Sequence, residues 1–314
     1  MSQKLEAAVP KQHVKRKRNR MEKREEKYFW VFISPWVIGF VLFIGGPILA
    51  SLLLSFTDYS VMEFPEFVGL ANFINLFQDP LFYKSLGVTF YYAALAIPFS
   101  VIIGLALAML LNLNVRGQTF FRTFFYAPSI ISGVSIAFLW MWILNPQFGV
   151  VNSFLYNVFG IEGPGWFTDT STVIPSFVIM QLTSIGGTMI IFLASLQQLP
   201  KELYESAAID GAGAWRRFIQ ITVPLISPVI LFNSIIALIN SFQIFTQAYV
   251  VTGGGPDWMS YFYVYYLFET AFSQYRIGYA SAQAWVLFVI IFSLTLFSLW
   301  VSKNAVHYEY EEKK

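Results

Sequence analysis

The sequence contains no cysteine and only two histidines, His13 and His307, among its 314 residues. Without cysteine the chain can form no disulfide, thiolate nucleophile or cysteine-ligated metal site. Both histidines lie in polar stretches near the chain ends, which argues against a buried histidine-based metal or catalytic centre. We therefore predict no catalytic residue and no metal ligand in this chain.

Charge is also scarce. Asp, Glu, Lys and Arg make up 12% of the residues, about half of the roughly 25% typical of soluble domains. Hydrophobic residues account for 56%, with 33 Phe, 17 Tyr and 9 Trp, and the mean hydropathy is +0.58. This composition excludes a soluble globule, a coiled coil and a disordered chain, and it predicts an integral membrane protein.

The phosphate-binding motif G-x-x-x-x-G-K-[ST] is absent, so we predict that the chain does not hydrolyse ATP itself. The glycine-rich Gly253–Pro256 lacks the Lys and Ser/Thr of that motif and indicates a turn. The apolar segments contain no ionisable residue, which argues against an intramembrane enzyme or a proton-coupled carrier. A sodium-coupled carrier stays open. No cofactor is expected in this chain.

Six uncharged windows are long enough to cross a hydrocarbon core of about 30 Å, which requires roughly 20 residues per helix. The predicted fold is all-α and polytopic, with transmembrane helices near residues 31–56, 86–113, 124–145, 172–196, 226–250 and 278–301. Between the first two, apolar residues at helical spacing predict a short interfacial helix over Val68–Asp79. Gly160–Asp169 is rich in Gly, Pro and Trp, which indicates a turn against the membrane face.

Lysine and arginine are distributed asymmetrically among the connecting segments. If the N-terminus is cytoplasmic, 18 of the 20 lie in the two tails and in segments 114–122 and 199–217. Only Lys84 and Arg276 lie outside. The bias of positive charge towards the cytoplasm therefore predicts that both termini are inside.

The predicted organisation is a basic cytoplasmic N-tail (1–27), a six-helix permease domain (28–302) with a cytoplasmic loop at 199–228, and a cytoplasmic C-tail (303–314). The tail contains the run Lys15–Arg20. A nucleic-acid patch is one interpretation, but beside a transmembrane helix the run is more typical of contact with anionic lipid. We expect membrane lipid as a partner and no nucleic acid.

The loop at 199–228 has a pattern of its own. Good helix formers over Lys201–Asp210 predict a helix, Gly211 and Gly213 break it, and Ala214–Thr222 predicts a second short helix before Pro224. Small residues around the glycine break would let another backbone approach closely. The pattern predicts a docking hairpin, with a merely solvated helical hairpin as the alternative.

This loop resembles the EAA loop of binding-protein-dependent ABC importer permeases, written E-A-A, three residues, G, nine residues, I-x-L-P. Glu205, Ala207, Gly211 and Ile221–Pro224 match in type and spacing, with Ser206 and Val223 as conservative departures. The longer form YEAAxIDGA, typical of the carbohydrate branch, is met by Tyr204–Ala212 apart from Ser206.

Four further segments are similar to that branch in the right order: Phe67–Phe82, Arg116–Ser132, Phe242–Pro256 and Gly278–Phe288. One segment departs from it, because Met180–Thr183 stands where the family often has a tryptophan. The local wall of the solute path is therefore expected to differ there.

The resemblance implies a type I permease subunit of an ATP-driven importer for a sugar or oligosaccharide in a bacterial or archaeal cell membrane. It implies as partners a second, homologous permease, two ATPase subunits that hold ATP and Mg, and an extracytoplasmic solute-binding protein. It also implies that the loop is a coupling helix in a groove of the ATPase, contacted through Tyr204, Glu205, Ala207, Asp210, Gly211, Ile221 and Pro224.

With no charge in the spans, a solute path has to use amides, hydroxyls and aromatic rings, which suits a neutral polyol. The fifth span places Asn240, Gln243 and Gln247 on one helical face. The fourth span has Gln181, Ser184 and Thr188 at the same spacing. The alternative is that these side chains only hold helices together.

Two tryptophans, Trp140 and Trp142, are interpreted as membrane-interface residues rather than a platform for sugar rings. Two rival functions remain open. One is the same kind of importer for a solute such as a glycerol phosphate, and the other is a stand-alone secondary carrier.

Overall fold

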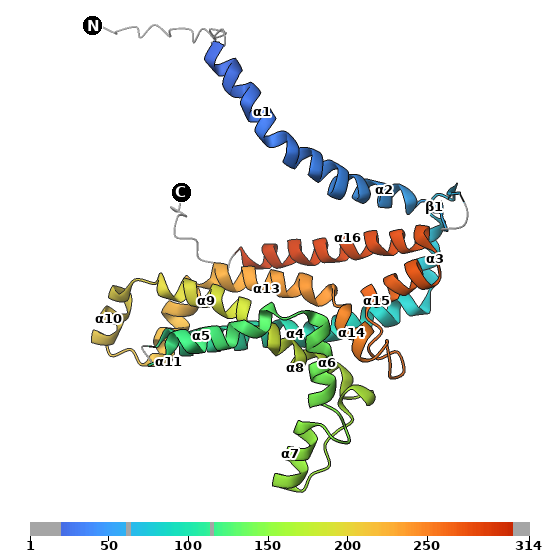
Figure 1. Ribbon diagram of the computed structural model, residues 1–314. Helices are drawn as coiled ribbons and strands as arrows, with labels where there is room; N and C mark the ends of the chain where they lie inside the picture. Colours follow the sequence, from blue (N-terminus) through green and yellow to red (C-terminus); the bar gives the residue numbers. More distant parts are fainter. Residues whose placement is uncertain (1–19, 61–63, 114–115, 304–314) are drawn as a thin grey trace, which may run out of the picture. The chain divides into compact units, whose positions relative to one another are not determined.

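The computed structural model describes residues 20–60, 64–113 and 116–303, and it divides into a unit that ends at Leu53 and a unit that begins at Leu54. The smaller unit contains α1 (Arg20–Phe40), a π-helical turn (Val41–Gly45) and all but the last residue of α2 (Gly46–Leu54), drawn in blue in Figure 1. Together they form one apolar helix over Arg24–Leu54. Most of the two predicted tails, residues 1–19 and 304–314, lies outside the described residues.

The larger unit is built from helices and one short antiparallel strand pair, β1 (Thr57–Asp58) with β2 (Glu66–Phe67). Its helices are α3 (Ala71–Gln78), α4 (Pro80–Asn112), α5 (Gln118–Tyr126), α6 (Gly133–Ile143), α7 (Val150–Phe159), α8 (Val173–Gln181), α9 (Gly186–Gln197), α10 (Lys201–Ile209), α11 (Ala214–Arg217), α12 (Val223–Leu225), α13 (Ser227–Phe242), α14 (Thr246–Val251), α15 (Tyr263–Phe268) and α16 (Ile277–Ser302). Short 3₁₀ or π-helical turns connect several of them.

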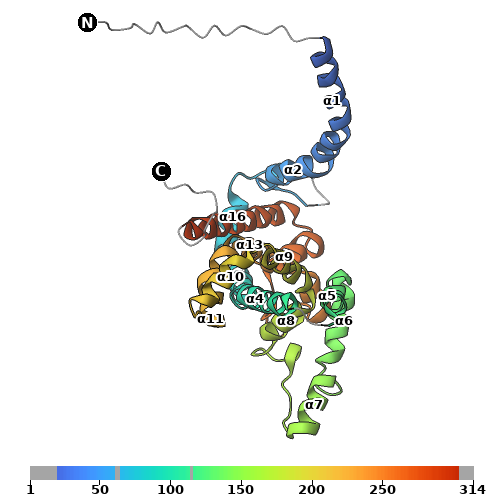
Figure 2. The same cartoon turned by 90° about the vertical axis from the view of Figure 1, so that its left-hand side faces the viewer.

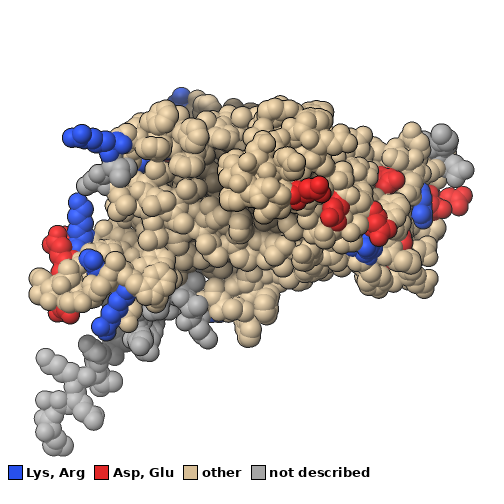
Figure 3. Space-filling view, turned by 90° about the horizontal axis from the view of Figure 1, so that it is seen from below, with Lys and Arg blue, Asp and Glu red and all other residues tan. Residues whose placement is uncertain are grey.

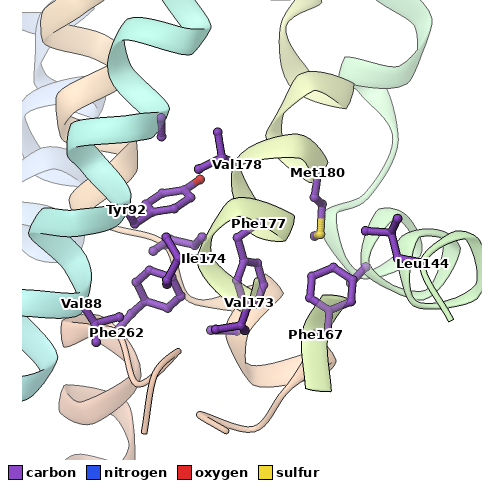
Figure 4. Close-up of a cluster of buried hydrophobic side chains, with 14 of the residues drawn as sticks. Val88, Tyr92, Leu144, Phe167, Val173, Ile174, Phe177, Val178, Met180 and Phe262 are labelled. Atoms are coloured by element: carbon purple, nitrogen blue, oxygen red, sulfur yellow. The ribbon is translucent and has the colours of Figure 1, made fainter. Parts of the chain in front are cut away.

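The long helix α4 is the centre of this unit. It packs along α8, α9 and α13, and α16 covers α13, as Figures 1 and 2 show from two directions. One buried cluster joins α4 to α8 and to the segment before α15 (Figure 4). There the Phe262 ring meets Tyr92 and Phe177 edge to face, at centroid distances of 5.3 and 5.6 Å.

Four helices are long and apolar enough to cross a membrane: Arg24–Leu54, Pro80–Asn112, Ser227–Val251 and Ile277–Ser302. They correspond to the first, second, fifth and sixth predicted spans. The third and fourth predicted spans are wrong as single helices. They are helix pairs, Gln118–Ile130 with Gly133–Ile143, bent by 103°, and Val173–Ser184 with Gly186–Gln197, bent by 54°. The described residues therefore provide four spans, or up to six if each bent pair crosses once.

The break in the third span has a local cause. Residues 127–130 form a 3₁₀ turn that contains Pro128, whose ring cannot donate the hydrogen bond of a continuing α-helix. Ile131 and Ser132 are then extended, and α6 begins only at Gly133. A window without charge does not reveal such a break, which is why the sequence suggested one continuous helix.

Gly186 allows the fourth span to bend against the end of α5. A Cβ atom added there would lie 2.6 Å from the carbonyl oxygen of Phe125 and 2.7 Å from the Cα of Tyr126. These are main-chain atoms, so the contact can be relieved only by moving one helix. Gly187, the next residue, has nothing within 4 Å of an added Cβ.

We expect Gly186→Ala to destabilise the fold by about 1–3 kcal/mol, the usual cost of overpacking, and Gly187→Ala to leave stability nearly unchanged. Thermal unfolding of the two variants in detergent is the measurement. Equal melting temperatures for the pair would contradict the close approach of α9 and α5.

The short elements between the spans agree with the sequence in part. The predicted helix over Val68–Asp79 is confirmed as α3, and Gly160–Asp169 is irregular apart from one 3₁₀ turn. Helix α7 was not predicted. Asn152 on α7 fixes this region, because its side-chain amide donates to the carbonyl oxygens of Pro146 and Pro164 and accepts a 2.6 Å hydrogen bond from Trp166 Nε1.

Candidate functional site: a helical hairpin and a polar cavity

The loop at 199–228 folds as the sequence predicts. Helix α10 covers Lys201–Ile209, the glycine turn follows, and α11 continues through a π-helical turn to Thr222. Gly211 has φ +75°, the left-handed region that favours glycine. Its N–H donates to Ala208 O at 3.1 Å, and Ala212 N–H donates to Ala207 O at 2.9 Å. This pair of bonds is a Schellman cap, which closes the end of α10 without any side chain.

The hairpin is poorly buried within this chain. No residue of α10 or α11 is buried, and Ile209 and Trp215 are 87% and 72% exposed. Figure 3 shows charged side chains gathered over the end where α10 lies and again at the opposite end, with a broad uncharged band between them. Apolar side chains exposed on a polar hairpin are typical of a protein-binding surface.

The seven predicted coupling residues divide into two groups. Glu205, in the middle of α10, and Asp210 and Gly211, at its end, are exposed. The other four are half-buried and face the body of the molecule: Tyr204, Ala207, Ile221 and Pro224. The Tyr204 hydroxyl lies 2.8 Å from Thr222 Oγ1, a hydrogen bond that joins α10 to the π-helical turn. The hairpin is therefore attached to the helix that continues into α13.

Tyr204→Phe is expected to remove about 0.5–1.5 kcal/mol of this attachment and to raise hydrogen exchange of the α10 amides severalfold. Thr222→Val removes the same bond from its other end. Because the two changes delete one interaction, the double variant should differ little from either single variant. Additive effects would mean that the two hydroxyls act independently.

A cavity of about 360 Å³ lies among α4, α8, α9, α13 and α14. All six residues predicted for the solute path line it: Gln181, Ser184, Thr188, Asn240, Gln243 and Gln247. Sequence spacing alone did not place the two sets together. The structure brings them to one cavity.

Both helices that supply these residues are interrupted beside the cavity. Helix α13 ends at Phe242 and α14 begins at Thr246, so the single helical face predicted for the fifth span is wrong even though its three residues stay together. A 3₁₀ turn at Leu182–Ser184 interrupts the fourth span in the same way. Within membranes, non-helical backbone is tolerated where it is buried in protein or lines a water-filled cavity.

The cavity is polar but uncharged along its described lining. In the part of the chain that the structure describes, the side-chain amides of Asn240, Gln243 and Gln247 make no hydrogen bond. Gln181 differs, because its Oε1 accepts a 3.0 Å hydrogen bond from the Tyr92 hydroxyl.

The sequence missed one aromatic residue of this region and misplaced another. Tyr92, in the middle of an uncharged span, lines the cavity, and no periodic pattern marks it. Trp140, interpreted as an interface residue, instead packs on the buried cluster and donates from Nε1 to Thr183 Oγ1 at 2.8 Å. Trp142 is 54% exposed, as an interface residue would be.

At the opposite end from the hairpin, Asp79 ties three helices together. Its Oδ1 caps α4 by accepting from Leu81 N–H at 2.9 Å, and its Oδ2 accepts from the hydroxyls of Tyr266 and Tyr279. Burial and then the bond to Asp79 raise the pKa of Tyr266, so its phenol stays protonated and donates. The cluster explains why α15 and α16 sit against the start of α4.

Residues 96–306 match the family model described as "Binding-protein-dependent transport system inner membrane component". The chain is 37% identical over 301 residues to the probable ABC transporter permease protein YesP of Bacillus subtilis, covering 95% of this chain and 97% of that one. It is 31% identical to AmyD of Thermoanaerobacterium thermosulfurigenes, a probable starch degradation products transport system permease protein, covering 88% and 94%. The fold is similar to a crystal structure of a bacterial ABC transporter involved in the import of the acidic polysaccharide alginate, with TM-score 0.81, 24% identity and coverage of 92% and 100%.

Proposed function

The chain belongs to the family of binding-protein-dependent transport system inner membrane components, and from this we propose that it is the permease subunit of an ATP-driven importer for a sugar or oligosaccharide. It is a multi-pass membrane protein. The named function of the starch-product relative supports a carbohydrate. The uncharged polar cavity supports the same class of solute.

The observation that carries the proposal is the set of free amides in that cavity. A sugar presents hydroxyls, each of which needs a hydrogen-bond partner when it leaves water. Asn240, Gln243 and Gln247 offer donors and acceptors that are not used within the described part of this chain. We assign Gln181, Ser184 and Thr188 to the facing wall of the path, with a second permease supplying the other half.

A glycerol phosphate would need a cation near its phosphate, and no lysine or arginine is among the residues that line this cavity. An importer for such an anion is therefore the less favoured alternative. The lining of this cavity, and not the fold, distinguishes a sugar importer from an importer for a glycerol phosphate.

The hairpin is proposed to couple this chain to an ATPase subunit. In this proposal Glu205, Asp210 and Gly211 enter a groove of that subunit, and the half-buried Tyr204, Ala207, Ile221 and Pro224 transmit its movement to α13. ATP and Mg bind to the ATPase subunits, and this chain holds no cofactor. Both termini and the hairpin are assigned to the cytoplasm. If ATP and the loaded binding protein both favour the outward-facing state, their effects are coupled.

The test is to tag the C-tail, extract the protein gently from native membranes and identify what co-purifies. An ATPase, a second permease and a solute-binding protein should appear, and thermal shift of that binding protein across a sugar panel should identify the solute. Vanadate should inhibit uptake. If the chain comes out alone and transports in vesicles without ATP and with sodium, it is a secondary carrier and the proposal is wrong.

A further inference from the structure

A second cavity, of about 600 Å³, lies beneath the hairpin, away from the proposed solute path. Its walls come from the end of α4, the start of α5, the end of α9, and the hairpin itself. The lining is amphipathic. Met109, Leu113 and Leu196 line it together with residues that carry amide, hydroxyl and cationic groups.

The charged side chains in the described lining of this cavity are all positive. Lys201 and Arg217 both line it, and the described lining contains no carboxylate. Glu202 and Glu205, the acidic residues of α10, are exposed and are not among the lining residues. The positive end of the α10 helix dipole, at Lys201, adds to the same sign.

Two arginines of this region are incompletely satisfied. The Nε atom of Arg217 is buried and has no hydrogen-bond partner among the described residues. Arg122 Nε is also buried without a hydrogen-bond partner among the described residues. Arg122 lies one helical turn from Gln118, which lines the cavity. Both Nε atoms are buried, and Arg122 is not among the residues that line the cavity, so the charges available to a ligand there are the remaining guanidinium nitrogens of Arg217 and the ammonium of Lys201.

We propose that this cavity binds a phosphate group, carried either by the headgroup of an anionic lipid or by a soluble phosphate monoester. The guanidinium group of Arg217 can bond two phosphate oxygens, and Lys201 supplies a second positive charge. Gln197 offers a further amide donor, whereas the Gln118 amide already donates to the carbonyl oxygen of Leu111, and the apolar lining residues suit the glycerol end of a lipid. Because the ligand would join α4 and α9 to the hairpin, its occupancy would stiffen the coupling element.

The cytoplasmic position of the site rests on the proposed function, but its test needs no transport. The purified transporter is placed in nanodiscs of phosphatidylcholine. One arm adds phosphatidylglycerol and counts retained lipid by native mass spectrometry. The other arm titrates glucose 6-phosphate into nanodiscs that lack anionic lipid. Arg217→Gln is expected to weaken binding of the effective probe at least tenfold.

Arg216→Gln is the matched control. Arg216 is the neighbouring residue, carries the same charge, is exposed, and already bonds Gln220 Oε1 through its Nε at 2.9 Å. It does not line the cavity, so binding should change less than twofold. Loss of lipid alone identifies a headgroup site, and loss of glucose 6-phosphate alone identifies a soluble ligand.

If the Arg217→Gln variant does not assemble, Lys201→Gln replaces the other cationic lining residue, which is exposed, and makes the same test. Equal binding by the cavity variant and Arg216→Gln overturns the proposal. So does a third result, in which neither probe binds and Arg217→Gln instead releases the ATPase subunit. That result would mean that an acidic side chain of the ATPase occupies the cavity.

Discussion

Gly211→Val is expected to reduce solute uptake at least tenfold while the protein still inserts and folds in the membrane. The reason is conformational, because an added Cβ at Gly211 meets no atom within 4 Å. At φ +75° a β-branched residue is strained by roughly 1–3 kcal/mol. We expect the turn to relieve this strain by breaking the two Schellman hydrogen bonds, which changes the backbone conformation between α10 and α11. The measurements are uptake in vesicles and co-purification of the ATPase.

Two variants separate this cause from general damage to the loop. Gly211→Asn should keep most of the uptake, since asparagine tolerates the left-handed region. Gly213 lies two residues on, with φ −64° and ψ 165°, a conformation open to any residue, and an added Cβ there is also free of contacts. Gly213→Val should therefore keep uptake within about threefold, the modest cost of losing a glycine N-cap. Normal uptake by Gly211→Val would refute the docking role of the hairpin.

The hairpin was predictable because its signals are local. Good helix formers, the glycine break at Gly211 and a second run ending before Pro224 each act on the neighbouring backbone. The Schellman cap and the start of α10 follow from those residues without help from distant packing. The residues that match the family motif lie in this same local pattern.

The breaks in the spans were not predictable in the same way. Pro128 was visible, but a proline inside an apolar window can either kink a helix or be tolerated in it. The bend near Gly186 depends on the approach of Phe125, about 60 residues earlier in the chain, which no pattern within the span records. Hydropathy measures affinity for the bilayer, not backbone direction, so it recovers the apolar segments and misses their bends.

The residues of the proposed solute path were predictable in part. The amides of the fifth span could be assigned to one helical face from their spacing, and the helix in fact ends beside Gln243. The break still leaves Asn240, Gln243 and Gln247 on the wall of one cavity, and their role in solute passage stays a prediction. Tyr92 could not be found, because its only signal is its contact with Gln181.

Asn240→Leu should reduce uptake about tenfold or more. Leucine has a similar size, so the cavity keeps its shape, but a solute hydroxyl that had bonded the amide now enters without a partner. ATPase activity stimulated by the loaded binding protein should persist, because the hairpin is untouched. Loss of uptake with retained stimulation would place the defect in the solute path and not in coupling.

The matched control is Asn233→Leu, the same change on the same helix. Asn233 is buried and does not line the cavity, and among the described residues its side chain bonds only the carbonyl oxygen of Val229, on its own helix, at 3.1 Å. Its replacement removes no group that a solute could reach, so uptake should stay within about threefold. If Asn233→Leu were the damaging variant and Asn240→Leu transported normally, the amides of α13 would serve helix packing, and the solute path would have to be sought elsewhere.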